Sequence, residues 1–168
     1  RGVSWLYEAT VGAGLPVIDT LRKLIESGDQ IQSIEGCPSG TLGFIFGELG
    51  RGVHFSDALH RAVAAGYTEP DPREDLGGAD VARKALILGR LIGFRGELGD
   101  IVVNSLVPAA LAAASRDEFL RRVDECDEHW STRVASAAQR GTVLRYRARV
   151  TRRAINVGLV EVDAASGI

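Results

Sequence analysis

The spacing of apolar residues predicts a chain that is largely helical before a pair of strands near its end. Residues 79–92 carry the most regular helical pattern, with one apolar face formed by Val81, Ala85, Leu88 and Ile92. An earlier helix is predicted to begin at Leu15-Pro16, where the missing N–H of proline costs little, and to stop at Gly28. Its apolar face consists of Val17, Leu21, Leu24 and Ile25.

The same criterion predicts further helices. The apolar run from Ser39 to about Gly50 indicates a buried helix. Ser56 is a natural N-cap for the next helix, which is expected to end at Gly66. Residues 117–139 indicate one or two amphipathic helices.

Alternation of apolar and polar residues predicts the strands. Residues 142–151 and 154–163 alternate most clearly, and the short turn between them favours an antiparallel hairpin. Residues 3–7 and 30–35 are predicted as shorter strands, whereas residues 68–76 hold two prolines and four acids and are expected to form no regular element. Together these elements predict an α+β fold, with a mixed or antiparallel sheet and helices packed on one face.

Composition narrows the classes of function. A chain of 168 residues that is 45% hydrophobic and 25% charged fits one globular domain. The formal charge of −2 gives no electrostatic reason to expect a nucleic acid, and no apolar run reaches the roughly 20 residues that span a bilayer. The chain opens with no signal peptide and its two cysteines are too few for a disulfide framework, so a cytoplasmic protein with reduced thiols is predicted.

The densest group of chemically active side chains lies in residues 68–84. Four acids, Glu69, Asp71, Glu74 and Asp75, fall within seven positions, and such a cluster repels itself unless a cation or an ammonium group neutralises it. Asp80 and Lys84 follow four residues apart on a predicted helix, so they share a face and can form an ion pair.

Two interpretations of this group remain open on the residues alone. In the first, it is a solvated turn followed by a surface ion pair, which contributes only about 0.3–0.5 kcal/mol. In the second, Lys84 is partly buried among Val81, Ala82 and Ala85, and its pKa is then tunable for proton transfer.

The whole segment from Ala62 to Lys84 resembles the signature of the homoserine dehydrogenases, with the run Tyr67-Thr68-Glu69-Pro70-Asp71-Pro72 at its centre. The sequence of this run is more similar to the bifunctional aspartate kinase–homoserine dehydrogenases and the fungal enzymes than to the short bacterial form. Residues 7–16 resemble the segment where the two domains of that family join, and residues 39–42 resemble its substrate loop. The resemblance extends from about Trp5 to the final strands.

The resemblance implies the NAD(P)-dependent, reversible reduction of L-aspartate 4-semialdehyde to L-homoserine, a step toward threonine and methionine. It implies that Lys84 is the acid/base group at the substrate oxygen and that Asp80 orients it. It implies that Glu69 and Asp75 hold the α-ammonium group of the substrate. Further substrate contacts are implied for Tyr67, Gly40 and Thr41.

A sodium ion is also implied, bound by the carboxylate of Glu8 and the main-chain carbonyls of Val11, Ala13 and Leu15. Oxygen ligands of this kind suit a hard cation. Gly12 and Gly14 in the same segment are open to two interpretations, a tight turn that needs positive φ or a direct contact with a ligand.

Some residues depart from the family pattern or invite other interpretations. Pro38 stands where the family more often has an apolar residue, which stiffens the substrate loop. Cys37 beside it suggests a nucleophile, but no histidine lies nearby in the sequence to activate it, and a small packed cysteine is the commoner case. The three histidines show no metal-ligand spacing and are interpreted as surface or packing residues: His54, His60 and His129.

The sequence holds no G-x-G-x-x-G turn of a dinucleotide-binding domain, since Gly12-Ala13-Gly14 is followed by Leu15-Pro16 and lacks the third glycine. In the family, that domain precedes this segment and the last helices return to it. We therefore expect residues 1–168 to be the catalytic and dimerisation domain, a homodimer that cannot bind NAD(P) or turn over alone. The alternative is a non-catalytic module for amino-acid binding or dimerisation.

Overall fold

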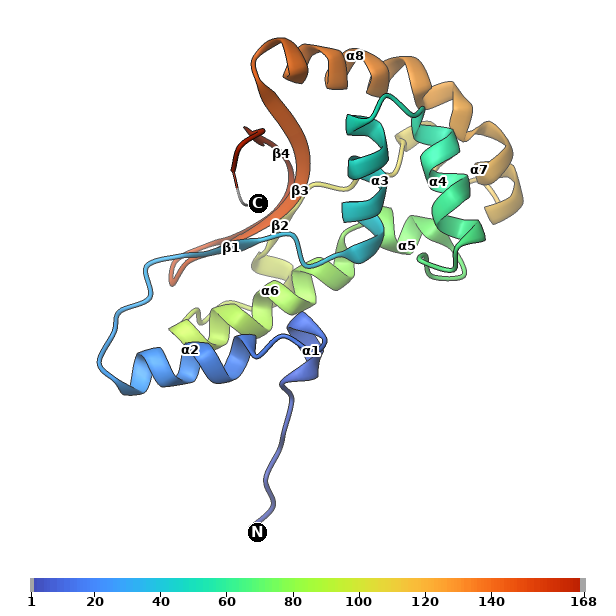
Figure 1. Ribbon diagram of the computed structural model, residues 1–168. Helices are drawn as coiled ribbons and strands as arrows, with labels where there is room; N and C mark the ends of the chain where they lie inside the picture. Colours follow the sequence, from blue (N-terminus) through green and yellow to red (C-terminus); the bar gives the residue numbers. More distant parts are fainter. Residues whose placement is uncertain (1, 167–168) are drawn as a thin grey trace.

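The computed structural model describes residues 2–166, which form an α+β fold around one mixed sheet (Figure 1). The sheet has the order β1-β3-β4-β2. The long hairpin at its centre is antiparallel, β1 adds antiparallel to β3, and β2 adds parallel to β4. The strands are β1 (Ile34–Gly36), β2 (Val102–Val103), β3 (Thr142–Val150) and β4 (Ile155–Asp163). The predicted fold class and hairpin are confirmed.

Helices make up most of the rest of the described chain. The α-helices are α1 (Ala9–Gly12), α2 (Val17–Glu26), α3 (Gly40–Gly50), α4 (Phe55–Ala64), α5 (Pro72–Leu76), α6 (Ala79–Ile92), α7 (Arg116–Arg122) and α8 (Asp127–Gln139). Three single 3₁₀ turns are η1 (Leu98–Asp100), η2 (Ala109–Leu111) and η3 (Val123–Cys126). The predicted helices at residues 16–28, 39–50, 79–92 and 117–139 are therefore confirmed.

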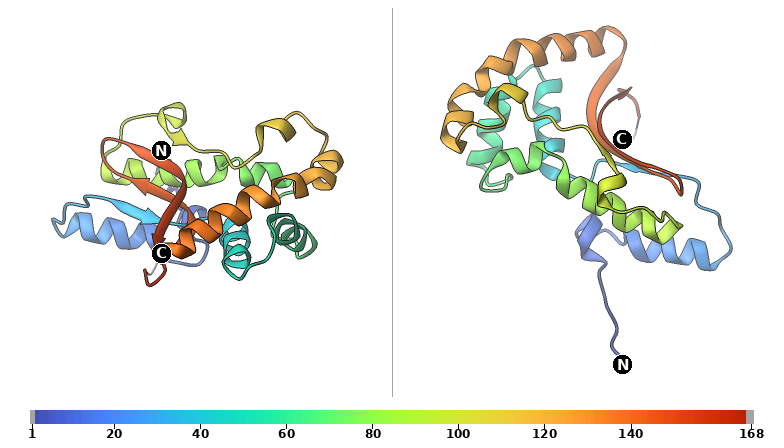
Figure 2. Two further views of the ribbon diagram at one scale, coloured as in Figure 1. Left: turned by 90° about the horizontal axis from the view of Figure 1, so that it is seen from above. Right: turned by 180° about the vertical axis from the view of Figure 1, so that it is seen from behind.

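The helices pack on one face of the hairpin. Seen from above, β3 and β4 lie over α6 (Figure 2), which contacts both strands, and α3 and α8 also contact β3. The side chains of β3 that face the helices are buried: Leu144, Tyr146, Ala148 and Val150. The alternate positions of β3 carry Arg145, Arg147 and Arg149, so the two faces of this strand differ in polarity.

Two predicted strands are corrected. Residues 3–7 form no strand; the chain extends outward toward its N-terminus (Figure 1), and Trp5 remains 84% exposed. Of the strand predicted over residues 30–35, only Ile34 and Glu35 lie in β1, which also takes in Gly36 and pairs with the end of β3. A strand needs a neighbouring strand for its backbone hydrogen bonds, and alternation in the sequence cannot show whether one is present.

Two local predictions are also wrong. Ser56 does not cap α4 from outside, because the helix already begins at Phe55. Instead the carboxylate of Asp127, on α8, accepts hydrogen bonds from the Ser56 backbone N–H at 2.8 Å and from its hydroxyl at 2.6 Å. Residues 68–76 are not wholly irregular, because Pro72 opens the short helix α5 and Asp71 caps it by accepting from Arg73 N–H.

Candidate functional site

The predicted ion pair lies on α6. Lys84 Nζ is 2.7 Å from Asp80 Oδ2, which confirms that the two side chains share a helix face. The same Nζ donates to the carbonyl oxygen of Pro38 at 3.1 Å, just before the first residue of α3. The Lys84 side chain is 25% exposed, against 62% for Asp80. The interpretation of a fully solvated surface pair is therefore wrong for the lysine.

The start of α6 is fixed by a close packing contact. Gly78 precedes the helix with φ +75°, a backbone conformation that favours glycine, and its Cα lies against the ring of Tyr146. The Tyr146 hydroxyl donates to the carbonyl oxygen of Asn104 at 2.9 Å, and burial raises the pKa of Tyr146 to about 12. The phenol therefore stays protonated and holds the N-terminal end of α6 against the sheet.

Asp75 joins three segments of the candidate site. Its Oδ1 is 2.8 Å from the Thr41 hydroxyl, which is also 2.6 Å from the carbonyl oxygen of Tyr67. Its Oδ2 accepts from the backbone N–H of Glu69 at 2.8 Å. Asp75 thus ties the loop at residues 67–69 to the first turn of α3, and each of its two oxygens keeps a lone pair for a ligand.

A hollow of about 430 Å³ opens beside this junction. It is lined by Gly40, Thr41, Phe44 and Tyr67. The ring of Tyr67 is 55% exposed and meets the ring of Phe44 edge-on, with centroids 5.1 Å apart. Glu69 is exposed, and its carboxylate forms no ion pair within residues 2–166. Glu69 is not one of the residues that line the hollow, but its backbone is bonded to Asp75 at the junction beside it, and an exposed carboxylate can neutralise an ammonium group.

Of the predicted residues, Lys84 and Asp75 contact the segment at the N-terminal end of α3, and the hollow itself is lined by Gly40, Thr41 and Tyr67. The four charged residues are not among those that line it: Glu69, Asp75, Asp80 and Lys84. Lys84 reaches Pro38 and Asp75 reaches Thr41, three residues further along the chain. Sequence reasoning missed the part played by the Pro38 carbonyl and by Phe44. The position of Phe44, one helical turn after Thr41, was the pattern that could have revealed it.

The segment proposed for sodium has a structural role of its own. Both carboxylate oxygens of Glu8 accept backbone N–H groups at the start of α2, from Ile18 and Asp19 at 2.8 Å each. The carbonyl oxygen of Leu15 accepts from Val17 N–H, and Ala13 has φ +50°. Carboxylate and carbonyl oxygens are donors that suit a hard cation, but here both oxygens of Glu8 and the carbonyl of Leu15 already accept backbone hydrogen bonds.

Gly12 in this segment is explained by packing. A Cβ added to Gly12 would lie 2.7 Å from Cγ2 of Val17, so the close turn between α1 and α2 requires glycine there. A Cβ at Gly14 would meet no atom within 4 Å. The expected turn with glycine at positive φ is wrong for both positions, because the positive φ of this segment falls on Ala13; close packing explains Gly12 and does not account for Gly14.

Cys37 lines a mostly apolar hollow of about 340 Å³ between α1, β1 and α6. Burial raises the pKa of its thiol, although the charges of Arg145 and Arg147 oppose that shift. A protonated thiol is a poor nucleophile, so the structure favours the packing interpretation.

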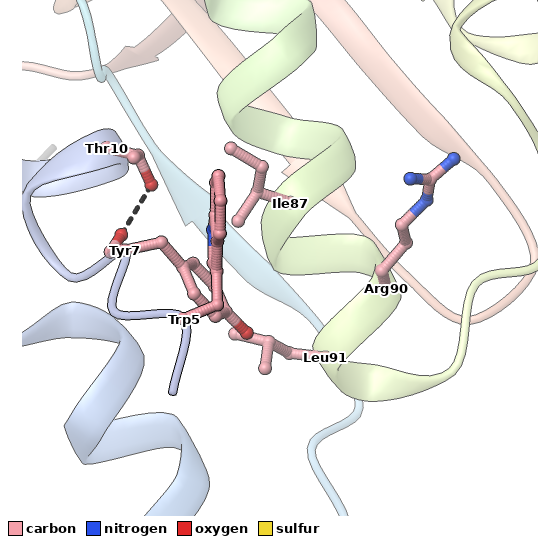
Figure 3. A pocket seen from close by; sticks show the side chains of 6 residues that line it. All are labelled: Trp5, Tyr7, Thr10, Ile87, Arg90 and Leu91. Carbon is pink, nitrogen blue, oxygen red and sulfur yellow. Dashed lines mark hydrogen bonds between the residues drawn. The ribbon is translucent and has the colours of Figure 1, made fainter. Parts of the chain in front are cut away.

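A separate hollow of about 370 Å³ lies between the N-terminal segment and α6 (Figure 3). Its walls are Trp5, Tyr7, Thr10, Ile87, Arg90 and Leu91. The Thr10 hydroxyl donates to the Tyr7 carbonyl at 2.6 Å and fixes the turn at its edge (Figure 3). None of the predicted substrate or catalytic residues lines this hollow, so it is distinct from the hollow at Tyr67.

Within residues 2–166, no helix is both long and apolar enough to cross a membrane.

Comparison with known proteins shows which family this chain resembles in sequence. The model of the family described as homoserine dehydrogenase matches residues 16–168. A bifunctional aspartokinase/homoserine dehydrogenase 2 of Zea mays, named as chloroplastic, is 54% identical over 143 residues, which cover 84% of this chain and 16% of that protein. The bifunctional aspartokinase/homoserine dehydrogenase of Haemophilus influenzae is 46% identical over 160 residues, or 95% of this chain and 20% of its own length.

Solved structures agree. A Candida auris protein of unknown function superposes with a TM-score of 0.89 at 40% identity, covering 96% of this chain and 47% of that one. A putative homoserine dehydrogenase from Archaeoglobus fulgidus gives a TM-score of 0.73 at 26% identity, covering 96% and 44%. A hyperthermophilic archaeal homoserine dehydrogenase solved in complex with NADPH shares the fold, with a TM-score of 0.66.

These matches define the class: an α+β domain that also occurs within longer proteins. The chain belongs to the homoserine dehydrogenase family. It spans about a fifth or less of the length of the curated relatives just named.

Proposed function

We propose that this domain supplies the substrate site and the acid/base group for the reversible, NAD(P)-dependent reduction of L-aspartate 4-semialdehyde to L-homoserine. One observation carries the proposal. Lys84, held by Asp80 and by the Pro38 carbonyl, lies at the same end of α3 as Thr41 and Asp75. An ammonium group can donate the proton that an aldehyde oxygen takes up on reduction, and an acidic loop can bind the α-ammonium group of an amino acid.

When bound, the nicotinamide supplies the hydride that reaches the carbonyl carbon. Negative charge then builds on the carbonyl oxygen, and Lys84 stabilises it and donates the proton that completes the alcohol. In the reverse direction, the neutral amine of Lys84 takes the hydroxyl proton. Asp80 keeps Nζ in place through its ion pair. We assign the dinucleotide itself to another domain, since residues 2–166 contain no glycine-rich strand–turn–helix unit.

The acidic loop, in this proposal, binds the α-ammonium group through Glu69 and the free lone pairs of Asp75. Tyr67, Gly40 and Thr41 form the wall of the hollow in which the amino acid lies. Asp75 has the second task of holding the loop, because its oxygens contact Thr41 and Glu69 N–H. The Glu69 side chain does not hold the loop, since only the backbone N–H of Glu69 contacts Asp75. Its replacement therefore tests binding without also disturbing the loop.

Replacement of Glu69 by alanine, with this domain joined to its nucleotide-binding domain, is expected to raise KM for the amino acid about tenfold or more. The value of kcat should change little, because an ion pair to the ammonium group contributes equally before and at the transition state. Glu74→Ala is the matched control, since it removes an exposed acid from the same segment. Equal KM values for both variants would remove Glu69 from the binding site.

A homodimer is proposed as the assembly. The sheet ends in the short, exposed edge strand β2, and Val102 on it is 64% exposed; edges of this kind are often covered by a partner. Light scattering at concentrations well above micromolar should give twice the mass of one chain, and the mass of a single chain would contradict the proposal.

Sodium is proposed to bind at Glu8 and the carbonyls of Val11, Ala13 and Leu15. Sodium chloride should then raise the melting temperature of the domain more than an equal concentration of choline chloride, by mass action on the folded state. The Glu8→Gln variant should lose the difference. Equal effects of both salts on the unaltered chain would exclude the site.

The cytoplasm is the compartment we propose, because both cysteines are free thiols in the described structure. Imaging of a fluorescent fusion of the full protein would test it, and accumulation in an organelle would contradict it.

A further inference from the structure

Two arginines hold the acidic loop from the side opposite α3. Asp71 Oδ2 is 2.6 Å from Arg73 Nη2, and Arg73 Nε lies 3.0 and 3.2 Å from the two carboxylate oxygens. Arg116 Nε donates to the carbonyl oxygen of Pro70 at 2.6 Å. The two residues that directly follow Glu69 in the chain are therefore each bonded to a guanidinium group.

Arg73 also reaches beyond its own loop. Its Nη1 donates to the carbonyl oxygens of Ala114 at 2.5 Å and Ala112 at 3.3 Å, and its guanidinium lies over the ring of Phe119 at 5.6 Å. The side chain is only 19% exposed. Hydrogen bonding to Arg73 is the main cause that holds the pKa of the Asp71 carboxyl below its usual range. Such a part-buried, multiply bonded arginine fixes geometry better than an exposed ion pair does.

We infer that Arg73 and Arg116 are positioning residues for substrate binding, acting through Glu69. This inference rests on the proposed function of Glu69. Asp75 fixes the Glu69 backbone from the side of α3, and the arginines fix Pro70 and Asp71 from the side of α7. With the backbone of residues 69–71 held on both sides, the exposed Glu69 carboxylate can meet an ammonium group without its loop first having to become ordered. The entropy of ordering is thereby removed from the binding step.

The experiment compares Arg73→Ala, Arg116→Ala and Glu69→Ala, with this domain joined to its nucleotide-binding domain. Arg73→Ala is expected to raise KM for the amino acid about tenfold, with kcat within about threefold and KM for NAD(P)H unchanged. Arg140→Ala is the matched control, because Arg140 makes a similar bidentate pair with Glu161 on the hairpin side of the molecule. A purely structural loss would lower the fraction of active enzyme and leave both KM values unchanged.

The double variant Glu69→Ala/Arg73→Ala decides whether Arg73 acts through Glu69. Its KM should equal that of Glu69→Ala within about twofold, since removal of the carboxylate leaves nothing to position. The inference would be overturned if the increase in KM of the double variant were the product of the two single increases, or if the Arg73→Ala enzyme had a normal KM. Either result would leave the proposed function intact. A Glu69→Ala enzyme with normal KM would overturn both. Where Arg73→Ala does not fold, the same cycle with the more exposed Arg116 gives the decision.

Discussion

Replacing Lys84 with alanine is expected to lower kcat by roughly 10²–10⁴-fold, the range for one acid/base group, when the variant is made in the full-length protein. Hydride addition builds negative charge on the carbonyl oxygen, and a cationic donor stabilises that charge more in the transition state than in the ground state. KM for the amino acid should change much less, because Glu69 and Asp75 remain. Consumption of NAD(P)H, followed by absorbance, measures both constants.

The chain provides a closely matched control. Its two lysines both form ion pairs with an aspartate four residues earlier, at 2.6 Å for Lys23 with Asp19 and 2.7 Å for Lys84 with Asp80. They differ in surroundings, since the Lys23 side chain is 73% exposed and Lys84 is 25% exposed. Lys23→Ala should leave kcat unchanged. If Lys84→Ala keeps near-normal kcat while KM rises, Lys84 is a binding residue and the proposed mechanism is wrong.

The parts of the fold that could be predicted from sequence are those set by local pattern. The helix at residues 79–92 and the hairpin at residues 142–163 repeat their apolar positions often enough to fix both type and extent. The spacing of Asp80 and Lys84 likewise sets their contact, because four residues make one helical turn.

The parts that could not be predicted depend on partners distant in sequence. The cap on Ser56 comes from Asp127, 71 residues away, so the preference of serine for N-caps was misleading. Asp75 contacts Thr41 across 34 residues. The cluster of acids in residues 69–75 predicted that Asp75 binds a ligand. Only the tertiary structure shows that Asp75 also holds the loop, through Thr41 and the backbone N–H of Glu69. Residues 3–7 alternate like a strand but have no neighbouring strand to pair with in the described structure.

Replacement of Gly78 by alanine is expected to lower the free energy of unfolding by about 2–4 kcal/mol, more than a typical surface change. A Cβ at this position would overlap Tyr146 Oη and lie 2.9 Å from Cζ. The ring must then move, and the Asn104 carbonyl loses its hydrogen bond. Overpacking of this kind costs about 1–3 kcal/mol, added to about 1 kcal/mol for alanine at positive φ. Urea unfolding of the chain measures the loss.

Gly52→Ala separates the two contributions. Gly52 has φ +85°, but a Cβ there would meet no atom within 4 Å, so only the backbone cost of about 1 kcal/mol should appear. The same substitution can be made in a Tyr146→Phe variant, which lacks the Tyr146 hydroxyl. There, Gly78→Ala should lower the free energy of unfolding by about 1 kcal/mol or more less than in the unaltered chain, because no hydroxyl oxygen is overlapped and no hydrogen bond is broken. If Gly78→Ala and Gly52→Ala lower the free energy of unfolding equally, the contact with Tyr146 does not fix the start of α6. The N-terminal end of that helix, and with it Asp80, would then depend on the backbone turn alone.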